Sequence, residues 1–185
     1  MKPIEHNTES IRLTSSEIGH LWNTYMLEST VHHMFSYFLQ HVADVNIKEI
    51  LEICVYTTND SLGLLENTFK KAGLHTTRGT ISEDVCLTAP RLFSDIFYIL
   101  YLNCMAQFAL TTFSTAYSQS SRDDIRQIFK DYLNKLILVN QLVTELMLKK
   151  GFYVRTPSVP TRPEMDIVTK ESFLTCSLGL TEEEY

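Results

Sequence analysis

Four stretches of the chain place apolar residues at intervals of three and four, which is the period of an amphipathic helix. Short alternating patterns typical of β-strands are scarce. We therefore expect an all-α fold of four long helices. The stretches cover residues 14–42, 46–72, 89–118 and 121–150.

Capping residues predict where these helices begin and end. Thr14 and Glu17 have the spacing of a capping box, in which each side chain binds the backbone N–H of the other residue. Glycines after the second and fourth stretches are typical of helix C-termini. Further expected N-terminal signals are the pairs Asn46/Glu49 and Ser121/Asp124, and Thr88 or Ala89 followed by Pro90.

The third stretch, from Ala89 to Ala116, is apolar on almost every face, so we expect this helix to be buried on most of its surface. Its length would suit a membrane span. However, Arg91, Asp95, Asn103 and Gln107 interrupt it, and no other stretch resembles a span. A buried bundle helix without membrane insertion is the prediction.

Loop lengths predict the topology. Short connections join the first stretch to the second and the third to the fourth, which is typical of two antiparallel hairpins. The middle connection, from Leu74 to Thr88, is long enough to run the length of a bundle. It predicts a ferritin-like four-helix bundle, two antiparallel hairpins joined by a long crossover. The alternative is an up-down bundle with a flexible loop.

We expect three segments: a flexible N-terminal arm (1–12), the four-helix bundle (13–151) and a Pro-containing C-terminal tail packed on the bundle (152–185). Pro157 and Pro160 have the spacing of a polyproline ligand, but a tail that lies along the bundle is the favoured interpretation. Gly63, within the second stretch, predicts a close helix contact.

The formal net charge of −6 argues against nucleic acid as a partner. Four widely spaced cysteines without a C-x-x-C pair are typical of reduced thiols in a cytoplasmic protein. Nothing near Cys86 in the sequence would lower its pKa. The polar N-terminus has no signal-peptide pattern, which again predicts a cytoplasmic location.

Several segments, among them LTSSEIGHLWNTYM, APRLFSDIFYILYL and SRDDIRQIF, resemble a family from endospore-forming bacilli, domain of unknown function 3231. The resemblance covers residues 13–179. It implies a ferritin-like bundle, with members often labelled as spore coat proteins, and no established activity. Many relatives carry two such repeats. The single repeat here, with Tyr37 and Tyr101 expected to be exposed, implies a homodimer.

A ferritin-like metal site needs glutamates on two helices and Glu-x-x-His on the other two. Glu17/His20 is the one helical match, and Glu17 is expected to act as a cap. Glu28 and His32 are candidates for a smaller metal site with Glu52 or Glu145. The favoured interpretation is a polar core layer or cavity without a cofactor. Its residues are Tyr25, Glu28, His32, Asn103, Gln107 and Asn140.

The sequence therefore predicts a non-catalytic structural or interaction protein, related to sporulation or the spore coat, with other spore or coat proteins as further partners. One alternative is a degenerate ferritin-like metal-binding oxidoreductase. A second is a carrier of a small ligand within an aromatic-rich interior. No complete catalytic constellation is present in the sequence.

Overall fold

The computed structural model describes residues 11–157, and within this range it contains helices and no strand. Residues 11–153 belong to one compact unit, whereas residues 154–157 carry no regular secondary structure. The all-α prediction is confirmed. The predicted tail contacts beyond Pro157 and most of the predicted N-terminal arm lie outside the described residues. The helices are α1 (Ser15–His41), α2 (Val45–Lys71), the short 3₁₀-helix η1 (Ser82–Asp84), α3 (Asp95–Gln119) and α4 (Asp123–Lys150).

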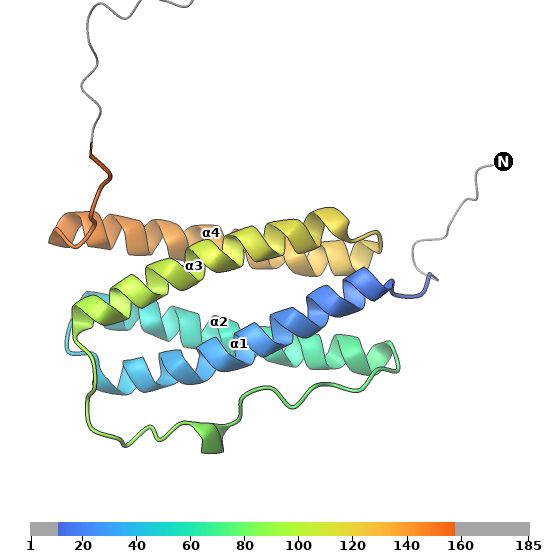
Figure 1. Cartoon of the computed structure of the whole chain (residues 1–185), viewed down its shortest axis with the longest axis horizontal. Helices are drawn as coiled ribbons and strands as arrows, with labels where there is room; N and C mark the ends of the chain where they lie inside the picture. The colour runs from blue at the N-terminus through green and yellow to red at the C-terminus, as the bar shows by residue number, and fades with distance from the viewer. Residues whose placement is uncertain (1–10, 158–185) are drawn as a thin grey trace, which may run out of the picture. The chain divides into compact units, whose positions relative to one another are not determined.

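Figure 1 shows two antiparallel hairpins, α1 with α2 and α3 with α4. The connection from Ala72 to Ser94 runs along the bundle and returns to the end where α2 begins. Helices α2 and α3 therefore run in the same direction. This is the predicted ferritin-like order with one long crossover, and the up-down alternative is wrong.

One glutamate caps two helices. Glu17 and Thr14 form the predicted capping box of α1, with Thr14 N–H donating to Glu17 Oε2 at 2.8 Å. The other oxygen of Glu17 accepts from the N–H groups of Ser121 (2.8 Å) and Arg122 (2.9 Å) at the start of α4. Burial raises the pKa of Glu17, but the N–H groups of Thr14, Arg122 and Ser121 lower it to about 2. The predicted Ser121/Asp124 cap is wrong because α1 supplies this acceptor.

Two other predicted helix starts are also wrong. Helix α2 is capped by Asp44, whose side chain accepts from Asn46 and Ile47 N–H, and not by Asn46. Helix α3 begins at Asp95, with Ser94 as its cap. The backbone before Ser94 is not helical, and there the Tyr37 hydroxyl donates to Pro90 O (2.7 Å) and accepts from Leu92 N–H (3.1 Å).

The glycines differ in the space around them and in their backbone φ angles. Gly63 has no heavy atom within 4 Å of where a Cβ would lie, so the predicted close helix contact is wrong. Gly79, in the crossover, has φ +61° and approaches α1 closely, since a Cβ there would lie 2.7 Å from Ser29 Oγ. Gly73 and Gly151 have positive φ at the helix C-termini, as predicted.

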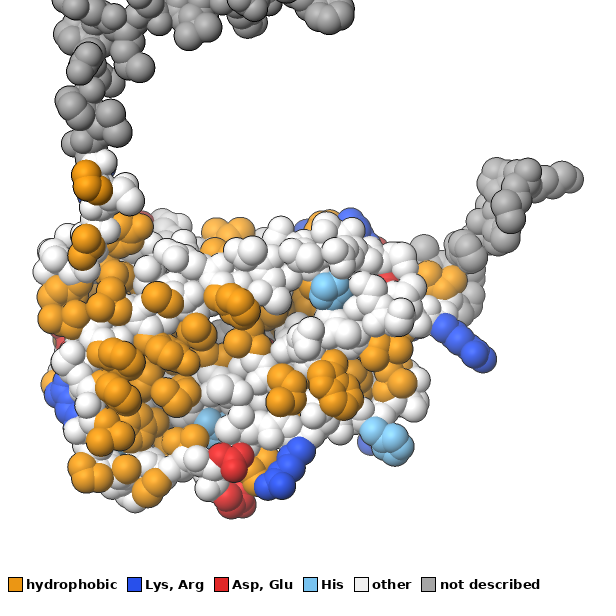
Figure 2. Space-filling view, viewed as in Figure 1, with side chains coloured by type: hydrophobic (Ala, Val, Ile, Leu, Met, Phe, Trp, Pro, Cys, Tyr) orange, Lys and Arg blue, Asp and Glu red, His pale blue; other side chains and the backbone are white. Residues whose placement is uncertain are grey.

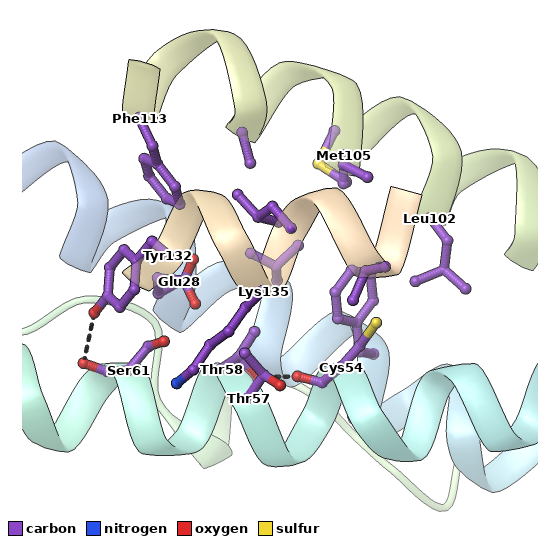
Figure 3. A pocket seen from close by; sticks show the side chains of 16 residues that line it. Glu28, Cys54, Thr57, Thr58, Ser61, Leu102, Met105, Phe113, Tyr132 and Lys135 are labelled. Carbon is purple, nitrogen blue, oxygen red and sulfur yellow. Dashed lines mark hydrogen bonds between the residues drawn. The ribbon is translucent and has the colours of Figure 1, made fainter. Parts of the chain in front are cut away.

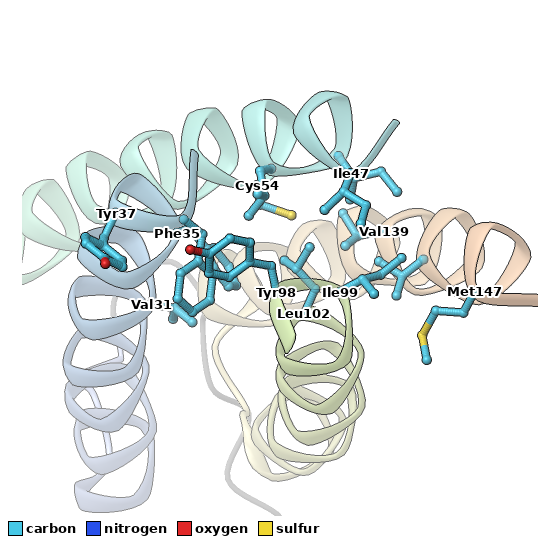
Figure 4. Packing of buried hydrophobic residues seen from close by; sticks show 14 residues of the cluster. Val31, Phe35, Tyr37, Ile47, Cys54, Tyr98, Ile99, Leu102, Val139 and Met147 are labelled. Carbon is cyan, nitrogen blue, oxygen red and sulfur yellow. The ribbon is translucent and has the colours of Figure 1, made fainter. Parts of the chain in front are cut away.

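The core consists of two clusters, one toward each end of the bundle. Figure 4 shows the cluster around Tyr98, Ile99 and Leu102 of α3, where all four helices contribute side chains. Helix α3 is nevertheless not buried on most of its surface. Only 39% of its most apolar 18-residue window is buried, and Phe108 is 56% exposed. The prediction of near-complete burial is wrong for this chain by itself.

Candidate functional site: a cavity at the centre of the bundle

A cavity of about 60 Å³ lies at the centre of the bundle, between the two core clusters. All four helices line it, and most of its wall is apolar (Figure 3). Helix α3 contributes apolar side chains alone, including Leu102 and Phe113. The polar groups come from α1, α2 and α4, and Glu28 of α1 is the acidic side chain among them.

Glu28 is buried, with 7% of its surface exposed, and it makes no hydrogen bond within the described residues. Removal from water raises the pKa of Glu28 to about 8, even though the charge of Lys135 acts in the opposite direction. A carboxyl group that lacks a donor is most stable in its neutral form. At neutral pH the cavity therefore contains a largely protonated acid.

Two hydroxyl groups on the cavity wall already have partners. Tyr132 donates to Ser61 O at 3.1 Å, and Thr58 donates to Cys54 O at 3.0 Å. The stem of Lys135 lines the cavity, and its ammonium group pairs with Asp60 at 2.9 Å, where both side chains reach solvent. This ion pair joins α4 to α2 at the outer side of the cavity.

The six residues of the predicted polar layer do not form one layer. No hydrogen bond in the described part of the chain joins any two of them. Tyr25 donates to Glu66 at 2.9 Å, and His32 Nδ1 binds the Thr58 hydroxyl at 2.9 Å. Burial, followed by the neighbouring charge of His33, lowers the pKa of His32. His32 does not line the cavity that contains Glu28.

The predicted amides lie elsewhere. Gln107 is exposed, Asn140 is half-buried, and Asn103 Oδ1 is buried without a hydrogen-bond partner among the described residues. The periodicity of α3 did not place Asn103 and Gln107 because this helix is apolar on both its buried and exposed faces. Sequence reasoning also missed Ser61, Tyr132 and Lys135, whose convergence depends on how the two hairpins pair.

A ferritin-like two-metal centre does not fit these residues. The described part of the chain contains no group of three His, Cys, Asp or Glu side chains that could hold a metal ion. Glu17 is occupied by the two helix caps, and His20 binds Gln119 at 2.9 Å. Glu52 and Glu145 are exposed, the latter accepting from Gln141. No ligand set therefore surrounds Glu28.

The aromatic and thiol predictions also change. Tyr37 is buried beneath the crossover, and Tyr101 is half-buried, packing against Phe38. Cys54, Cys86 and Cys104 are free thiols, and Cys176 lies outside the described residues. The side-chain hydrogen bond of Thr88, followed by its backbone hydrogen bond, lowers the pKa of Cys86. The sequence did not predict this lowered pKa.

Residues 2–165 match the profile of a family described as protein of unknown function, DUF3231. The chain belongs to the DUF3231 family. This match confirms the resemblance seen in the sequence, and it assigns no activity. No protein of curated function matches the chain.

Solved structures share the fold of this DUF3231 member. A structure from Bacillus halodurans, provisionally described as a spore coat protein, has a TM-score of 0.75 at 17% identity and covers 84% of this chain and 100% of its own. A conserved hypothetical protein from Mycobacterium tuberculosis has a TM-score of 0.60 at 9% identity, covering 72% of this chain and 98% of its own.

A third similar structure is a two-domain protein from Anabaena variabilis, with DJ-1/ThiJ/PfpI-like and ferritin-like domains. It has a TM-score of 0.57 at 14% identity and covers 80% of this chain but 41% of its own. At these identities the likenesses establish the fold. They carry no function over to this chain.

Proposed function

We propose that this protein is a non-catalytic structural or interaction protein that pairs with a second copy of itself through one face of α3. The supporting observation is an exposed, charge-free helix face. We call it the α3 face and define it by Ile96, Phe97, Leu100, Cys104 and Phe108, all of which are exposed.

The spacing of the α3 face suits an interface. At 100° per residue its five positions fall within about 120° of the helix circumference, opposite the buried residues Leu102, Ala106 and Ala109. No charged residue occurs between Ile96 and Gln119. In Figure 2, apolar side chains gather over the end of the bundle where α3 begins. Contiguous apolar surface of this kind is typical of interaction sites.

A second copy can occupy the α3 face without bringing like charges into contact. Each chain carries a formal charge of −6, so two copies repel when charged surfaces approach. The α3 face brings no charge to such a contact. A two-fold interface places the same surface of each copy against the other, and Cys104, near the middle of α3, would lie close to its counterpart in an antiparallel crossing.

Light scattering after size-exclusion chromatography tests the dimer. Wild-type protein is expected to be dimeric at about 50 µM, a concentration at which a micromolar dissociation constant gives mostly dimer. Leu100→Glu and Phe108→Glu should be monomeric, since each would bury an unpaired charge. Tyr56→Glu, on the exposed side of α2, is the matched control and should stay dimeric. A monomeric wild type, or dimers of both α3 variants, would reject this interface.

The spore association is a separate part of the proposal. It is supported by the description of the Bacillus halodurans structure, which shares this fold. Immunoblots of coat extracts from purified spores of the source organism should contain the protein. Its presence in vegetative cells alone would contradict a coat role. Elemental analysis of protein purified without chelators addresses the oxidoreductase alternative, which requires stoichiometric iron or manganese that is lost on Glu28→Ala.

A further inference from the structure

The cavity at the bundle centre contains the carboxyl group of Glu28, which makes no hydrogen bond within the described residues. A buried polar group without a partner destabilises a fold, and such groups gather at functional sites. Glu28 is 7% exposed, faces the cavity in Figure 3 and makes no hydrogen bond within the described residues. A positively charged donor would complete this site by pairing with the ionised carboxylate.

We propose that this cavity binds a small organic cation, a primary alkylammonium whose nitrogen pairs with Glu28 and whose alkyl chain packs on the apolar wall beside it, which includes Phe113 (Figure 3). The carboxylate accepts from the ammonium N–H groups, and the hydroxyl-bearing side chains Thr57 and Ser61 line the same space. The ring of Tyr132, also in the wall, adds a face that attracts a cation.

The size and ligand chemistry of the cavity select among the possible occupants. A volume of about 60 Å³ is far below the roughly 300–1,000 Å³ of pockets for drug-sized molecules, so a lipid does not fit. The volume accommodates about two waters or a ligand of a few heavy atoms. A divalent metal lacks ligands here, since the described residues contain no group of three His, Cys, Asp or Glu side chains that could hold one. An anion would need a positive charge, and the cation of the cavity wall, Lys135, already pairs with Asp60.

Binding of a cation should release a proton. The titratable or charged groups around Glu28 are Cys54 of α2 and Tyr132 and Lys135 of α4, while the part of α3 that lines the cavity brings none. Burial, followed by the charge of Glu28, raises the pKa values of Cys54 and Tyr132, so both stay neutral at pH 7. Lys135 is paired with Asp60. Glu28 is therefore the group that ionises when a cation enters.

Calorimetric titration with n-propylammonium at pH 7 tests the proposal. We expect saturable binding with a dissociation constant of order millimolar, as suits about four heavy atoms. Titrations in two buffers with different ionisation heats should give release of about one proton per ligand. The neutral isostere 1-propanol should bind at least about tenfold more weakly, because it lacks the charge that pairs with Glu28.

Substitutions at three cavity positions test which side chains hold the ligand. Glu28→Gln should weaken propylammonium binding at least about tenfold, whereas Glu52→Gln, an exposed control, should bind as wild type does. Ala106→Leu fills the cavity with Glu28 intact and should also abolish binding. Lys135→Met removes the competing cation and should strengthen binding severalfold.

The proposal is overturned if propylammonium does not saturate, if 1-propanol binds equally well, or if Glu28→Gln binds as wild type does. Weaker binding in Lys135→Met would equally reject it, since that result indicates a ligand held by the lysine. A high-resolution structure that contains water alone at Glu28 under saturating propylammonium would also overturn it. Circular dichroism of each variant verifies that a loss of binding is not a loss of fold.

Discussion

Glu17 and Glu28 are two buried glutamates on the same helix with opposite surroundings. Glu17 receives backbone N–H groups from the starts of two helices, which favour its charged form. Glu28 faces a mostly apolar cavity and makes no hydrogen bond within the described residues, and its burial favours the neutral form. A glutamate therefore stabilises the fold as a carboxylate at position 17, whereas at position 28 its contribution to stability decreases as the pH rises.

From the burial of Glu28 we predict that the free energy of unfolding falls as the pH rises. The folded state holds this proton up to about pH 8, whereas an unfolded glutamate loses it near pH 4.5. Between these values the folded state binds more protons, so the free energy of unfolding decreases by about 1.4 kcal/mol per pH unit at most. Glu28→Gln should remove this slope and be more stable than wild type at pH 8.

Urea unfolding of wild type and Glu28→Gln at pH 5, 6, 7 and 8 measures the difference between their slopes, in which the contributions of other titrating groups cancel. Glu52→Gln, exposed on α2, should keep the wild-type slope. If Glu28→Gln and wild type had the same slope, Glu28 would be charged in the folded protein, contrary to its surroundings in the cavity.

We predict a large loss of stability when the side chain of Glu17 is truncated. Glu17→Ala leaves the N–H groups of Thr14, Ser121 and Arg122 without their acceptor. Two lost caps should lower the free energy of unfolding by about 2–4 kcal/mol. Glu49→Ala, at an exposed glutamate near the start of α2, is the control and should change it by less than about 0.5 kcal/mol. Equal effects in chemical unfolding would contradict the double cap.

At the scale of elements, the crossover is held to α1 by specific contacts. Thr80 N–H donates to Ser29 Oγ at 3.1 Å, and Gly79 next to it lies close to the same hydroxyl. Farther along, the Tyr37 hydroxyl holds the backbone at Pro90 and Leu92. The Tyr37 contacts engage the Pro90 carbonyl and the Leu92 N–H just before α3, which starts at Asp95.

A pair of glycine substitutions should have opposite effects. Gly79→Ala introduces a Cβ at positive φ and 2.7 Å from Ser29 Oγ, which should destabilise the protein by about 1–3 kcal/mol. Gly63→Ala, in an open position within α2, should stabilise it by about 0.5–1 kcal/mol. Thermal unfolding monitored by circular dichroism measures both changes. A stabilising Gly79→Ala would show that the crossover is not tied to α1 at this point.

At the scale of the whole molecule, α3 has two apolar sides. One side packs in the core through Tyr98, Leu102 and Phe113, and the opposite side is the α3 face. Within the described residues α3 is the one helix long and apolar enough to span a membrane. Its Asp95 carboxylate accepts from the N–H groups of Ala43 and Asp44, which ties its start to the α1–α2 connection.

The proposed dimer predicts a concentration-dependent melting temperature. Association stabilises the folded state by mass action, so the Tm of wild-type protein should rise by several degrees between about 1 and 100 µM. Leu100→Glu should melt at the same temperature across this range, and Tyr56→Glu should behave as wild type does. A concentration-independent Tm for wild type, measured by scanning calorimetry, would argue against the dimer.

The sequence by itself determined the number of helices, their approximate spans, the capping box at Thr14 and the crossover topology. Each depends on residues close together in the chain or on the length of a connection, so spacing alone specifies it. The sequence also indicated the family and, in Glu28, one residue of the central cavity.

The tertiary structure alone decided the start of α3, the second cap made by Glu17 and the exposure of the α3 face. Each depends on a contact between distant segments, such as Tyr37 with Pro90 or Glu17 with Ser121. Apolar periodicity cannot separate a side chain in the core from one on an outer face, because both are apolar. Only the pairing of the two hairpins left Glu28 facing the cavity without a hydrogen bond among residues 11–157, while the His32 ring binds the Thr58 hydroxyl.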